Sequence, residues 1–570
     1  MSLEQANAAL TQPGSPLEVE EIEIRGNTTK VWKNAPPTYA MLARLAGSHG
    51  DKTFVVFDDE RVNYADWFKA TAALAHKFQE MGIEKGDRIA FAMQNLPEWP
   101  VIYFAGLSIG AIMVPLNAWW TGPELEFGIM DSGAKMLIAD GARFARIEPH
   151  LADLSAIETT IVSRHAGDLP DDVITLDSLI GHSSSWGDLP AQDLPAMADL
   201  GPDDDATILY TSGTTGKPKG AIATHRNGIT NLMSTAYATA RGALRRGETP
   251  PAAAEPTVYM LVIPLFHVTG CCAVMLGMMA TGSKMVMMRK WDATRALELI
   301  QEEKVKVTGG VPTVAWQILE HPERDQYDLS SLESMVYGGA PAAPELVRKI
   351  KAEFGASPGS GWGMTETSGT VTGHTAEDYL NRPDSCGPPV VVSDIKIMSE
   401  DGSRELPVGE IGELWAFGPQ VVRGYWNRPE ANAETFVDGW IRTGDLAKVD
   451  EEGFCYICDR AKDMIIRGGE NIYSSEVENC LYDHPAVTDA ALIGLPHKTL
   501  GEEPAAVVHL APGENATEEE LKEWVKERLA IFKTPVKIVF VEETLPRNAN
   551  GKIMKKDLAD LFFAEAEAAE

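Results

Sequence analysis

Apolar and polar positions along the first part of the chain predict strands that alternate with helices. The segment 52–64 reads KTFVVFDDERVNY, two β-rich runs around the acidic turn Asp58–Glu60, and predicts a hairpin. Apolar residues then recur at helical spacing over 67–78, and a second helical stretch begins near Pro97 between the apolar runs 88–93 and 111–116. This alternation is typical of α/β layers with a largely parallel sheet.

The same alternation returns between about 290 and 340, where a helical pattern at 293–303 precedes two short apolar runs. Ligand sites in such sheets lie beyond the carboxyl ends of the strands. Three strand ends are therefore predicted to meet at one pocket: ATILYTSGTTG at 206–216, VKVTGGVPT at 305–313 and SMVYGGAP at 334–341.

The stretch 258–283 carries no formal charge and is long enough to cross a bilayer. It contains Pro264, His267 and glycines, and it opens with the β-like run VYMLVI. We therefore expect a buried strand followed by a buried helix.

The last hundred residues predict a separate unit. A helical pattern at 516–529 starts with a capping box from Thr517 to Glu520, and it follows two strand-like runs at 490–495 and 505–510. The charged segment Asp459–Asp463 precedes them. We place the boundary there, with domains at 1–459 and 460–570, and interpret the tail FFAEAEAAE as a fraying helix end.

Length and charge narrow the class of protein. A chain of 570 residues indicates two or more domains. The apolar fraction of 44% is ordinary for a globular protein, and the net charge of −33 argues against a broad nucleic-acid surface. A small polyanion can still bind, because backbone N–H groups and a few lysines set the local potential.

Six cysteines in a chain of this length do not form a disulfide framework, and the N-terminus has no signal-peptide pattern. We expect a reducing cytoplasm. The sequence CYIC at 455–458 could be a redox pair or half a zinc site, but no second pair exists and residues three apart on a strand point to opposite faces.

The segment 211–220, TSGTTGKPKG, has the composition of a phosphate-binding loop. Its small residues let backbone N–H groups approach phosphate oxygens, and its hydroxyls add donors. It is no Walker A loop, because only two residues separate Gly213 from Gly216 and Pro218 follows Lys217. Taken alone, a flexible polar loop would be the alternative.

The order of this loop resembles the signature of the adenylate-forming enzymes, which include acyl-CoA synthetases, luciferases and peptide-synthetase adenylation domains. Further motifs of that family follow in the expected order: IPLFHVTG at 263–270, VYGGAP at 336–341, GWGMTE at 361–366, WIRTGD at 440–445, DRAKDMIIRGGENIYSSEVE at 459–478 and LPRNANGK at 545–552. The resemblance extends from about residue 30 to 560. It implies a large N-terminal domain of layered α/β subdomains with a small β-barrel-like subdomain, and a small mobile α+β C-terminal domain.

The resemblance also implies a nucleotide site for ATP. Trp362 would lie against the adenine, and Asp445 and Arg460 would reach the ribose. The phosphate loop would grip the β- and γ-phosphates. The other residues implied in nucleotide binding are Thr211, Ser212, Gly213, Thr214, Thr215, Gly216, Lys217, Gly338, Gly339, Ala340, Pro341, Gly363 and Met364.

Four residues are implied in the reaction itself. Thr365 would meet the α-phosphate, and Glu366 would hold Mg²⁺ together with Thr211. Lys552 would stabilise the incoming carboxylate and the transition state, and His267 would gate the carboxylate and thiol path. Without the resemblance, Glu366 would be interpreted as an exposed Glu, Lys552 as a solvated lysine beside Lys555 and Lys556, and His267 as a core histidine.

The C-terminal domain is implied to move between two half-reactions. Lys462 matches the family hinge, and Gly468 and Gly469 would line the pantetheine tunnel of coenzyme A after the domain swings.

The resemblance favours a carboxylate–CoA ligase that forms an acyl-adenylate and then a thioester. Amino acids are disfavoured, because the motif around His267 lacks the Asp that would hold an α-ammonium. Glycines leave room for a chain or ring, and apolar residues line it, so a medium- or long-chain fatty acid is the first choice and an aryl or arylpropenoic acid the second. The residues of this predicted acyl pocket are Gly309, Gly310, Val311, Gly338, Gly339, Met364 and the region of Val371.

Transfer to a carrier protein and luciferase-like use of O₂ stay open as alternatives. The expected partners are the acid, ATP and coenzyme A, without nucleic acid or an integral membrane segment, and a homodimer is compatible with these features.

Overall fold

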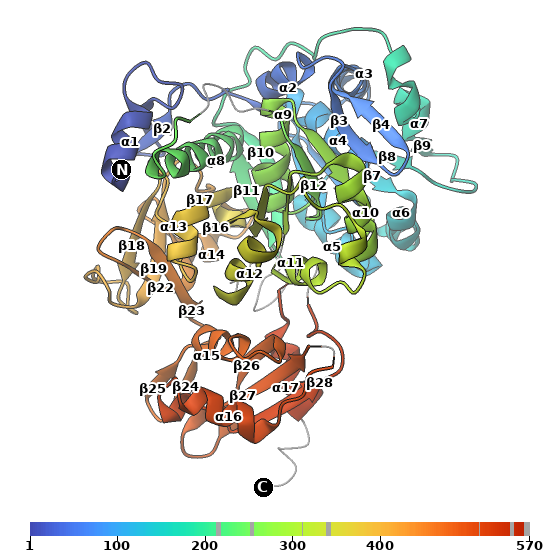
Figure 1. Cartoon of the computed structure of the whole chain (residues 1–570). Coiled ribbons are helices and arrows are strands. Elements are labelled where there is room, and N and C mark those ends of the chain that lie inside the picture. Colours follow the sequence, from blue (N-terminus) through green and yellow to red (C-terminus); the bar gives the residue numbers. More distant parts are fainter. Residues whose placement is uncertain are drawn as a thin grey trace.

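The computed structural model describes residues 1–211, 218–250, 256–310, 312–337, 344–511, 513–547 and 552–563. Within these ranges the chain forms a large body up to residue 460 and a C-terminal unit from residue 465 (Figure 1). We call the connection, residues 461–464, the crossing segment. These observations agree with the predicted α/β class.

The first large sheet is built from strands between residues 88 and 224, with β20 added from residues 424–425. Its strand order is β20-β11-β10-β6-β5-β7-β8-β9. The strands from β10 to β9 run parallel, whereas β11 and β20 run antiparallel at one edge. The bounds are β5 Arg88–Ala92, β6 Ile112–Leu116, β7 Met136–Asp140, β8 Thr159–Ser163, β9 Val173–Thr175, β10 Asp205–Thr211, β11 Lys219–Thr224 and β20 Gly424–Tyr425.

The second large sheet follows the order β17-β16-β15-β14-β12-β13-β3-β4. Its inner strands are parallel, and β17 and β4 are antiparallel edges. The hairpin predicted at 52–64 is formed by β3 and β4. The bounds are β3 Thr53–Phe57, β4 Glu60–Asn63, β12 Val258–Leu261, β13 Lys284–Met287, β14 Val307–Gly310, β15 Ser334–Tyr337, β16 Ser357–Met364 and β17 Gly369–Thr375.

Two antiparallel pieces complete the body. A ribbon joins β1 Val19–Ile24 to β2 Asn27–Trp32. The third sheet stands where the small β-subdomain was expected and pairs β18-β19-β22-β21, with β23 on β22. Its bounds are β18 Asp394–Met398, β19 Gly412–Phe417, β21 Phe436–Val437, β22 Trp440–Val449 and β23 Cys455–Arg460.

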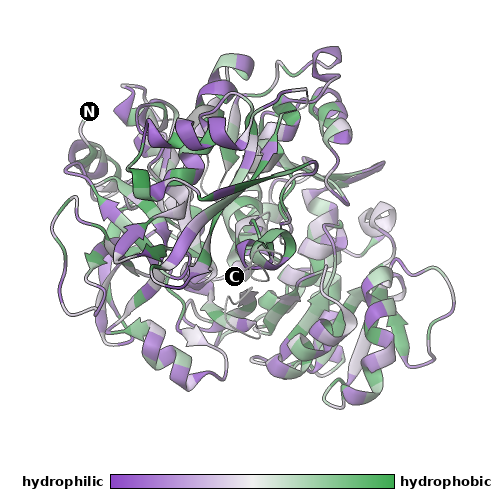
Figure 2. Ribbon diagram, turned by 90° about the horizontal axis from the view of Figure 1, so that it is seen from below, coloured by the Kyte–Doolittle hydropathy of each residue, from purple (hydrophilic) through white to green (hydrophobic). Residues whose placement is uncertain are grey.

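Helices cover both faces of the large sheets. One core cluster joins Phe54 of β3, Trp67 of α3, Phe91 of β5 and Trp99 of α4, so helices fill the space between the sheets. Figure 2 shows hydrophobic and hydrophilic residues mixed along many helices and strands, as elements with one buried face require. The bounds are α1 Leu3–Thr11, α2 Tyr39–Gly47, α3 Tyr64–Glu80, α4 Glu98–Ser108, α5 Gly122–Ser132, α6 Gly141–Ile147, α7 Leu176–Ile180, α8 His225–Arg245, α9 Leu276–Thr281, α10 Ala293–Glu303, α11 Pro312–Leu319, α12 Pro344–Phe354, α13 Ala376–Asn381 and α14 Pro429–Thr435.

The short helical turns are η1 Glu148–Asp153, η2 Ser183–Asp188, η4 Arg324–Gln326, η5 Thr365–Thr367 and η6 Ile531–Lys533, and η3 Thr269–Met275 is a π-helix. Side-chain caps explain where several helices begin. Asn63 accepts from the Asp66 N–H at the start of α3, and Asp292 accepts from the Arg295 N–H at the start of α10.

The uncharged stretch 258–283 forms β12, then η3 and α9, as the pattern predicted. Met260, Cys271, Met275 and Met279 in it are fully buried. Across the described ranges, no helix is both long and apolar enough to span a bilayer.

The C-terminal unit packs α15 and α16 on its own sheet, whose core includes Ile465, Val477, Leu492 and Val508. The capping box predicted at Thr517 is present and opens α16, which ends at Lys526, three residues before the end of the predicted helical segment. The bounds are β24 Ile465–Arg467, β25 Glu470–Ile472, β26 Val487–His497, β27 Gly501–Leu510, β28 Lys537–Val541, α15 Ser474–Tyr482, α16 Glu518–Lys526 and α17 Lys555–Phe563. The tail beyond residue 563 lies outside the described residues.

Candidate active site

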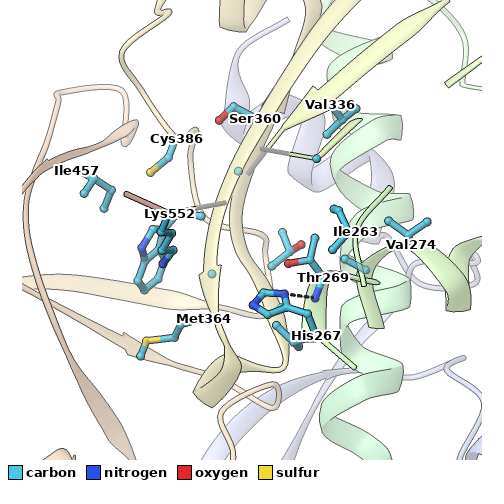
Figure 3. Close-up of a pocket in the computed structure, with 18 of the residues that line it drawn as sticks. Ile263, His267, Thr269, Val274, Val336, Ser360, Met364, Cys386, Ile457 and Lys552 are labelled. Atoms are coloured by element: carbon cyan, nitrogen blue, oxygen red, sulfur yellow. Dashed lines mark hydrogen bonds between the residues drawn. The ribbon is translucent and has the colours of Figure 1, made fainter. Parts of the chain in front are cut away.

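A continuous cleft of about 3280 Å³ runs through the large body and along its contact with the C-terminal unit. The ends of β10, β14 and β15 reach it at Thr211, Gly310 and Val336, which agrees with the predicted convergence of three strands. Lys552 of the C-terminal unit lines the same cleft (Figure 3).

The predicted nucleotide residues of β16, β22 and β23 meet on one wall. The indole N–H of Trp362 donates to Oδ2 of Asp445 at 2.8 Å, and Nε of Arg460 lies 3.3 Å from Oδ1 of the same carboxylate. Asp445 and Arg460 are directly paired across β22 and β23, so the strand register brings them together. Asp445 is only 7% exposed, although all three side chains line the cleft.

Glu413, which the sequence analysis missed, supports this wall from β19. Its carboxylate accepts from the Arg442 guanidinium at 2.9 Å, the Trp415 indole at 3.0 Å and the Gly444 N–H at 3.3 Å. Gly444 precedes Asp445, so Glu413 fixes the backbone that presents that carboxylate. No local motif marks Glu413, because Arg442 and Gly444, two of its three partners, come from another strand.

Glu366 is buried, with 6% exposure, and its Oε1 accepts from the Tyr425 hydroxyl at 2.7 Å. The Lys219 ammonium lies 4.4 Å from the centre of the Tyr425 ring. Burial raises the pKa of Glu366, although the Tyr425 hydrogen bond and the nearby Lys219 and Arg460 cations partly oppose it. The Glu366 carboxylate is shielded from water and borders the cleft. It could therefore ligate a divalent cation such as Mg²⁺, which prefers oxygen ligands.

Lys552 is surrounded by the other predicted residues. Burial lowers the pKa of its ammonium to about 8, and the Arg460 and Lys462 cations add to this, whereas Asp445 and Glu366 oppose it. The cation thus lies within electrostatic reach of both buried carboxylates.

His267 is on another wall of the cleft (Figure 3). Burial and the Lys552 cation lower its pKa to about 4, so the imidazole is neutral at physiological pH. Its Nδ1 accepts from the Thr269 N–H at 3.3 Å, which leaves Nε2 as the donor.

Thr365 and Met364 line the cleft at the end of β16, as predicted. Gly363 lines it too, but a side chain there would collide with the Gly369 carbonyl, since its Cβ would lie 1.9 Å from that oxygen. The glycine is therefore required by the close approach of β16 and β17.

The phosphate loop is described only at its ends. Thr211 lines the cleft, and its hydroxyl donates to the Lys219 carbonyl at 3.4 Å. The strand before it is anchored by Tyr210, whose hydroxyl donates to Asp131 at 2.8 Å. Outside the described residues lie Ser212, Gly213, Thr214, Thr215, Gly216, Lys217, Gly338, Gly339, Ala340 and Pro341.

Lys462 lines the cleft in the crossing segment. Gly468 and Gly469 do not: they form an exposed turn between β24 and β25, with φ of 61° and 91°. Their predicted place in a thiol tunnel concerns a second arrangement of the two units and stays a prediction.

Part of the predicted acyl wall differs from expectation. Val371 lies in a core cluster with Ala416 and Ile441 and does not face the cleft, although Gly369 and Thr370 do. Gly309 is required by packing, because a Cβ there would lie 1.8 Å from the Val336 carbonyl oxygen. Val311 is outside the described residues.

Two adjacent tryptophans, Trp119 and Trp120, have different surroundings. Trp119 lines the cleft and meets Phe266 edge to face at 5.2 Å, whereas Trp120 packs on Tyr210. Trp119 therefore borders the cleft next to the His267 motif.

Comparisons with known proteins match most of the chain. The family model described as AMP-binding enzyme matches residues 42–426, and that of the AMP-binding enzyme C-terminal domain matches residues 476–552. A long-chain-fatty-acid–CoA ligase of Mycobacterium tuberculosis is 35% identical over 510 residues, covering 89% of this chain and 94% of the relative. A feruloyl-CoA synthase of an Amycolatopsis species is 34% identical over 502 residues, covering 88% and 94%.

A similar solved structure is the o-succinylbenzoate coenzyme A synthetase of Bacillus subtilis in complex with ATP and a magnesium ion. It is 30% identical, with a TM-score of 0.75, and the match covers 92% of this chain and 100% of that chain. The same enzyme was solved with its acyl-adenylate intermediate, at a TM-score of 0.74.

The Tyr425 hydrogen bond to Glu366 can be tested by stability. Tyr425→Phe should destabilise the large body by about 1.5–3 kcal/mol at pH 8, because it removes a donor from a buried carboxylate. Since burial raises the pKa of Glu366, the cost should shrink toward pH 5 as the folded state takes up a proton.

Urea unfolding of the unmodified protein and of the Tyr425→Phe variant, at pH 5 and at pH 8, measures this loss in the free energy of unfolding. Tyr456→Phe is the matched control, because the Tyr456 hydroxyl donates to the partly exposed Asp450 at 3.0 Å and should matter by less than about 1 kcal/mol. An equal cost for Tyr425→Phe at the two pH values would contradict the interpretation.

Proposed function

The chain belongs to the AMP-binding enzyme family, and from that premise we propose that it is an acyl-CoA synthetase acting on a medium- or long-chain fatty acid. The family match confirms the resemblance of the sequence motifs. The family and the CoA-ligase relatives show an adenylate-forming carboxylate–CoA ligase that uses ATP, Mg²⁺ and coenzyme A. The identity of the acid is the finer proposal.

One observation carries the proposal. Lys552 comes from the C-terminal unit and lies in the cleft with Trp362, Asp445 and Glu366 of the large body. A nucleotide wall, a buried carboxylate and a cation therefore face one space, which is the set that activation of a carboxylate by ATP requires.

In the proposed first step, a carboxylate oxygen of the acid forms a bond to the α-phosphorus of ATP, and the bond to pyrophosphate breaks. Trp362, Asp445 and Arg460 orient the nucleoside. Lys552 and Thr365 stabilise the charge that develops on the α-phosphate. Glu366 and Thr211 would hold Mg²⁺, which would supply positive charge opposite the phosphates.

In the proposed second step, the thiol of coenzyme A attacks the acyl carbon, AMP leaves and the thioester forms. We propose that the units at 1–459 and 460–570 rearrange about Lys462 between the steps, which brings Gly468 and Gly469 to the thiol path. His267 is neutral and within electrostatic reach of Lys552, which fits a gate between the two paths.

The cleft wall next to His267 favours a long acyl chain. Helix α8 packs beside η3 and α9, and small uncharged residues of both line the cleft: Ala236, Thr239, Ala240, Ala243, Thr269, Ala273, Gly277 and Ala280. From Thr269 to Ala280 the wall extends roughly 16 Å at helical rise. With C–C bonds of about 1.5 Å, this accommodates an extended chain of roughly a dozen carbons.

An aryl or arylpropenoic acid is the second candidate. The feruloyl-CoA synthase relative supports it at nearly the same identity as the fatty-acid ligase.

The six cysteines are free, which fits the reducing cytoplasm that we propose as the location of the protein. The homodimer stays a prediction.

Acid-dependent pyrophosphate exchange tests the proposed function. A panel of hexanoate, dodecanoate, hexadecanoate and ferulate should give the highest kcat/KM with dodecanoate or hexadecanoate, and coenzyme A should convert the product to a thioester. Preference for ferulate would select the second candidate. Exchange without transfer to coenzyme A would point to a carrier-protein acceptor, and no exchange with any acid would contradict the proposal.

Lys552 should impose a pH limit on the first step. Because the pKa of its ammonium is lowered to about 8, the cation is present below pH 8 and is lost above it, so kcat/KM for exchange should fall as pH rises through about 8. Lys552→Ala should lower exchange about 100-fold or more and abolish the fall of kcat/KM above pH 8. Thioester formation from supplied acyl-adenylate should change less than about twofold. Equal losses in both half-reactions would refute the assignment.

Gly277 should limit the length of the acyl chain. A Cβ at Gly277 meets no atom within 4 Å, so Gly277→Ala should be tolerated, whereas Gly277→Phe places a ring in the channel. KM for hexadecanoate should rise about 10-fold or more in the Phe variant, with hexanoate little changed, because several methylenes lose their contact. An equal rise of KM for hexadecanoate and for hexanoate would show that the acyl chain does not pass Gly277.

A further inference from the structure

A buried asparagine outside the predicted site joins two walls of the cleft. Asn231 lies on α8 and is fully buried. Its Nδ2 donates to the Cys272 carbonyl in η3 at 2.9 Å, and its Oδ1 accepts from the Thr370 N–H in β17 at 2.7 Å. The two halves of one amide group therefore hold two elements that are distant in sequence.

The first of these elements, η3, begins the wall on which we place the acyl chain. Thr269 and Val274 of η3 line the cleft beside His267 (Figure 3). A π-helix is rare in proteins and is often found at functional sites. The Cys272 carbonyl lies within this π-helix and accepts from Asn231, so the amide fixes the wall to α8.

The second element leads directly to the turn η5, which carries Glu366. The Thr367 hydroxyl in this turn donates to the Gly369 carbonyl at 2.8 Å. Thr370, the next residue, is the one whose N–H donates to Asn231. The position of the turn is thus tied to α8 through the same amide that holds the acyl wall.

The contact between Asn231 and the start of β17 is tight. A Cβ at Gly369 would lie 2.4 Å from Oδ1 of Asn231, and the backbone φ of Gly369 is 117°. Both the lack of space and this backbone conformation require glycine. A change at Asn231 therefore acts on the start of β17 at close range.

One turn earlier on α8, Asn227 makes the same kind of contact away from the cleft. Its Nδ2 donates to the Pro419 carbonyl at 2.7 Å, and its Oδ1 accepts from the Thr224 N–H at 2.7 Å. Asn227 is 3% exposed, so the two asparagines are similarly buried. Neither Pro419 nor Thr224 is among the described residues that line the cleft. Asn227 therefore offers a comparison of similar burial and bonding without contact to the walls.

We propose that Asn231 is a positioning residue that sets the acyl wall of η3 against the turn η5, and so determines how a long acyl chain presents its carboxylate to the reaction site. The inference rests on the proposed function and adds a residue that governs its chain-length preference. A long acid contacts the η3 wall over much of its length, so the place of its carboxylate depends on the place of that wall. A short acid makes fewer such contacts and adjusts independently.

Acid-dependent pyrophosphate exchange with hexadecanoate and hexanoate tests this role in full-length variants. Asn231→Leu replaces the amide by an apolar group and removes both hydrogen bonds. It should lower kcat for hexadecanoate about 10-fold to 100-fold and kcat for hexanoate less than about threefold, because a displacement of about 1 Å near the reacting atoms has an effect of the larger size. Asn231→Asp keeps an acceptor for the Thr370 N–H, so its loss with hexadecanoate should be smaller.

Asn227→Leu is the matched control, because it also removes a buried, hydrogen-bonded amide from α8. Both Leu variants should lower the free energy of unfolding, measured with urea, but Asn227→Leu should leave the ratio of the two kcat values unchanged. Equal losses for the two acids in Asn231→Leu, or an equal change of this ratio in Asn227→Leu, would overturn the proposal. If Asn231→Leu does not fold, Asn231→Ala is measured against Asn227→Ala with the same expectations. A lack of preference for hexadecanoate in the unmodified protein would instead contradict the proposed function.

Discussion

The site depends on holding a cation of one unit beside buried carboxylates of another. Lys552 lies within electrostatic reach of Asp445 and Glu366, and Arg460 and Lys462 add two more cations. Burying charge is costly unless it is paired, so this cluster is stable only when its members face one another. In a protein of net charge −33, these three cations make the cleft locally attractive to anions.

Antiparallel strands at the edge of the body set the geometry of this cluster. Register on β22 and β23 places Asp445 opposite Arg460, while Glu413 of β19 fixes the turn before Asp445. Tyr425, the last residue of β20, donates its hydroxyl hydrogen to Glu366. The parallel sheets provide strand ends, and the antiparallel sheet aligns the polar groups on them.

Family motifs and local patterns predicted what depends on nearby sequence. The α3 and α16 helices followed from apolar spacing and caps, and Trp362, Asp445 and Lys552 followed from the order of motifs. Glu413 and Tyr425 were missed because Arg442, Gly444 and Glu366, with which they bond, are distant in sequence, and a lone Glu or Tyr in a strand carries no signature. In the predicted Val371 region, Gly369 and Thr370 line the cleft, whereas the Val371 side chain packs in the core.

Polar contacts join the described parts of the two units, which suits the rearrangement proposed between the two steps. Arg348 of α12 lies 3.6 Å from Asp483 beyond α15, and Asp459 holds the first turn of α15. A closed state held by charge responds to the charge of its ligand. In the proposed reaction, ATP brings several negative charges to the cations of the cleft and pyrophosphate removes most of them. Repulsion among Arg460, Lys462 and Lys552 then opposes the arrangement in which Lys552 lies in the cleft. Release of pyrophosphate in the first step would thus favour the rearrangement of the two units that we propose before the second step.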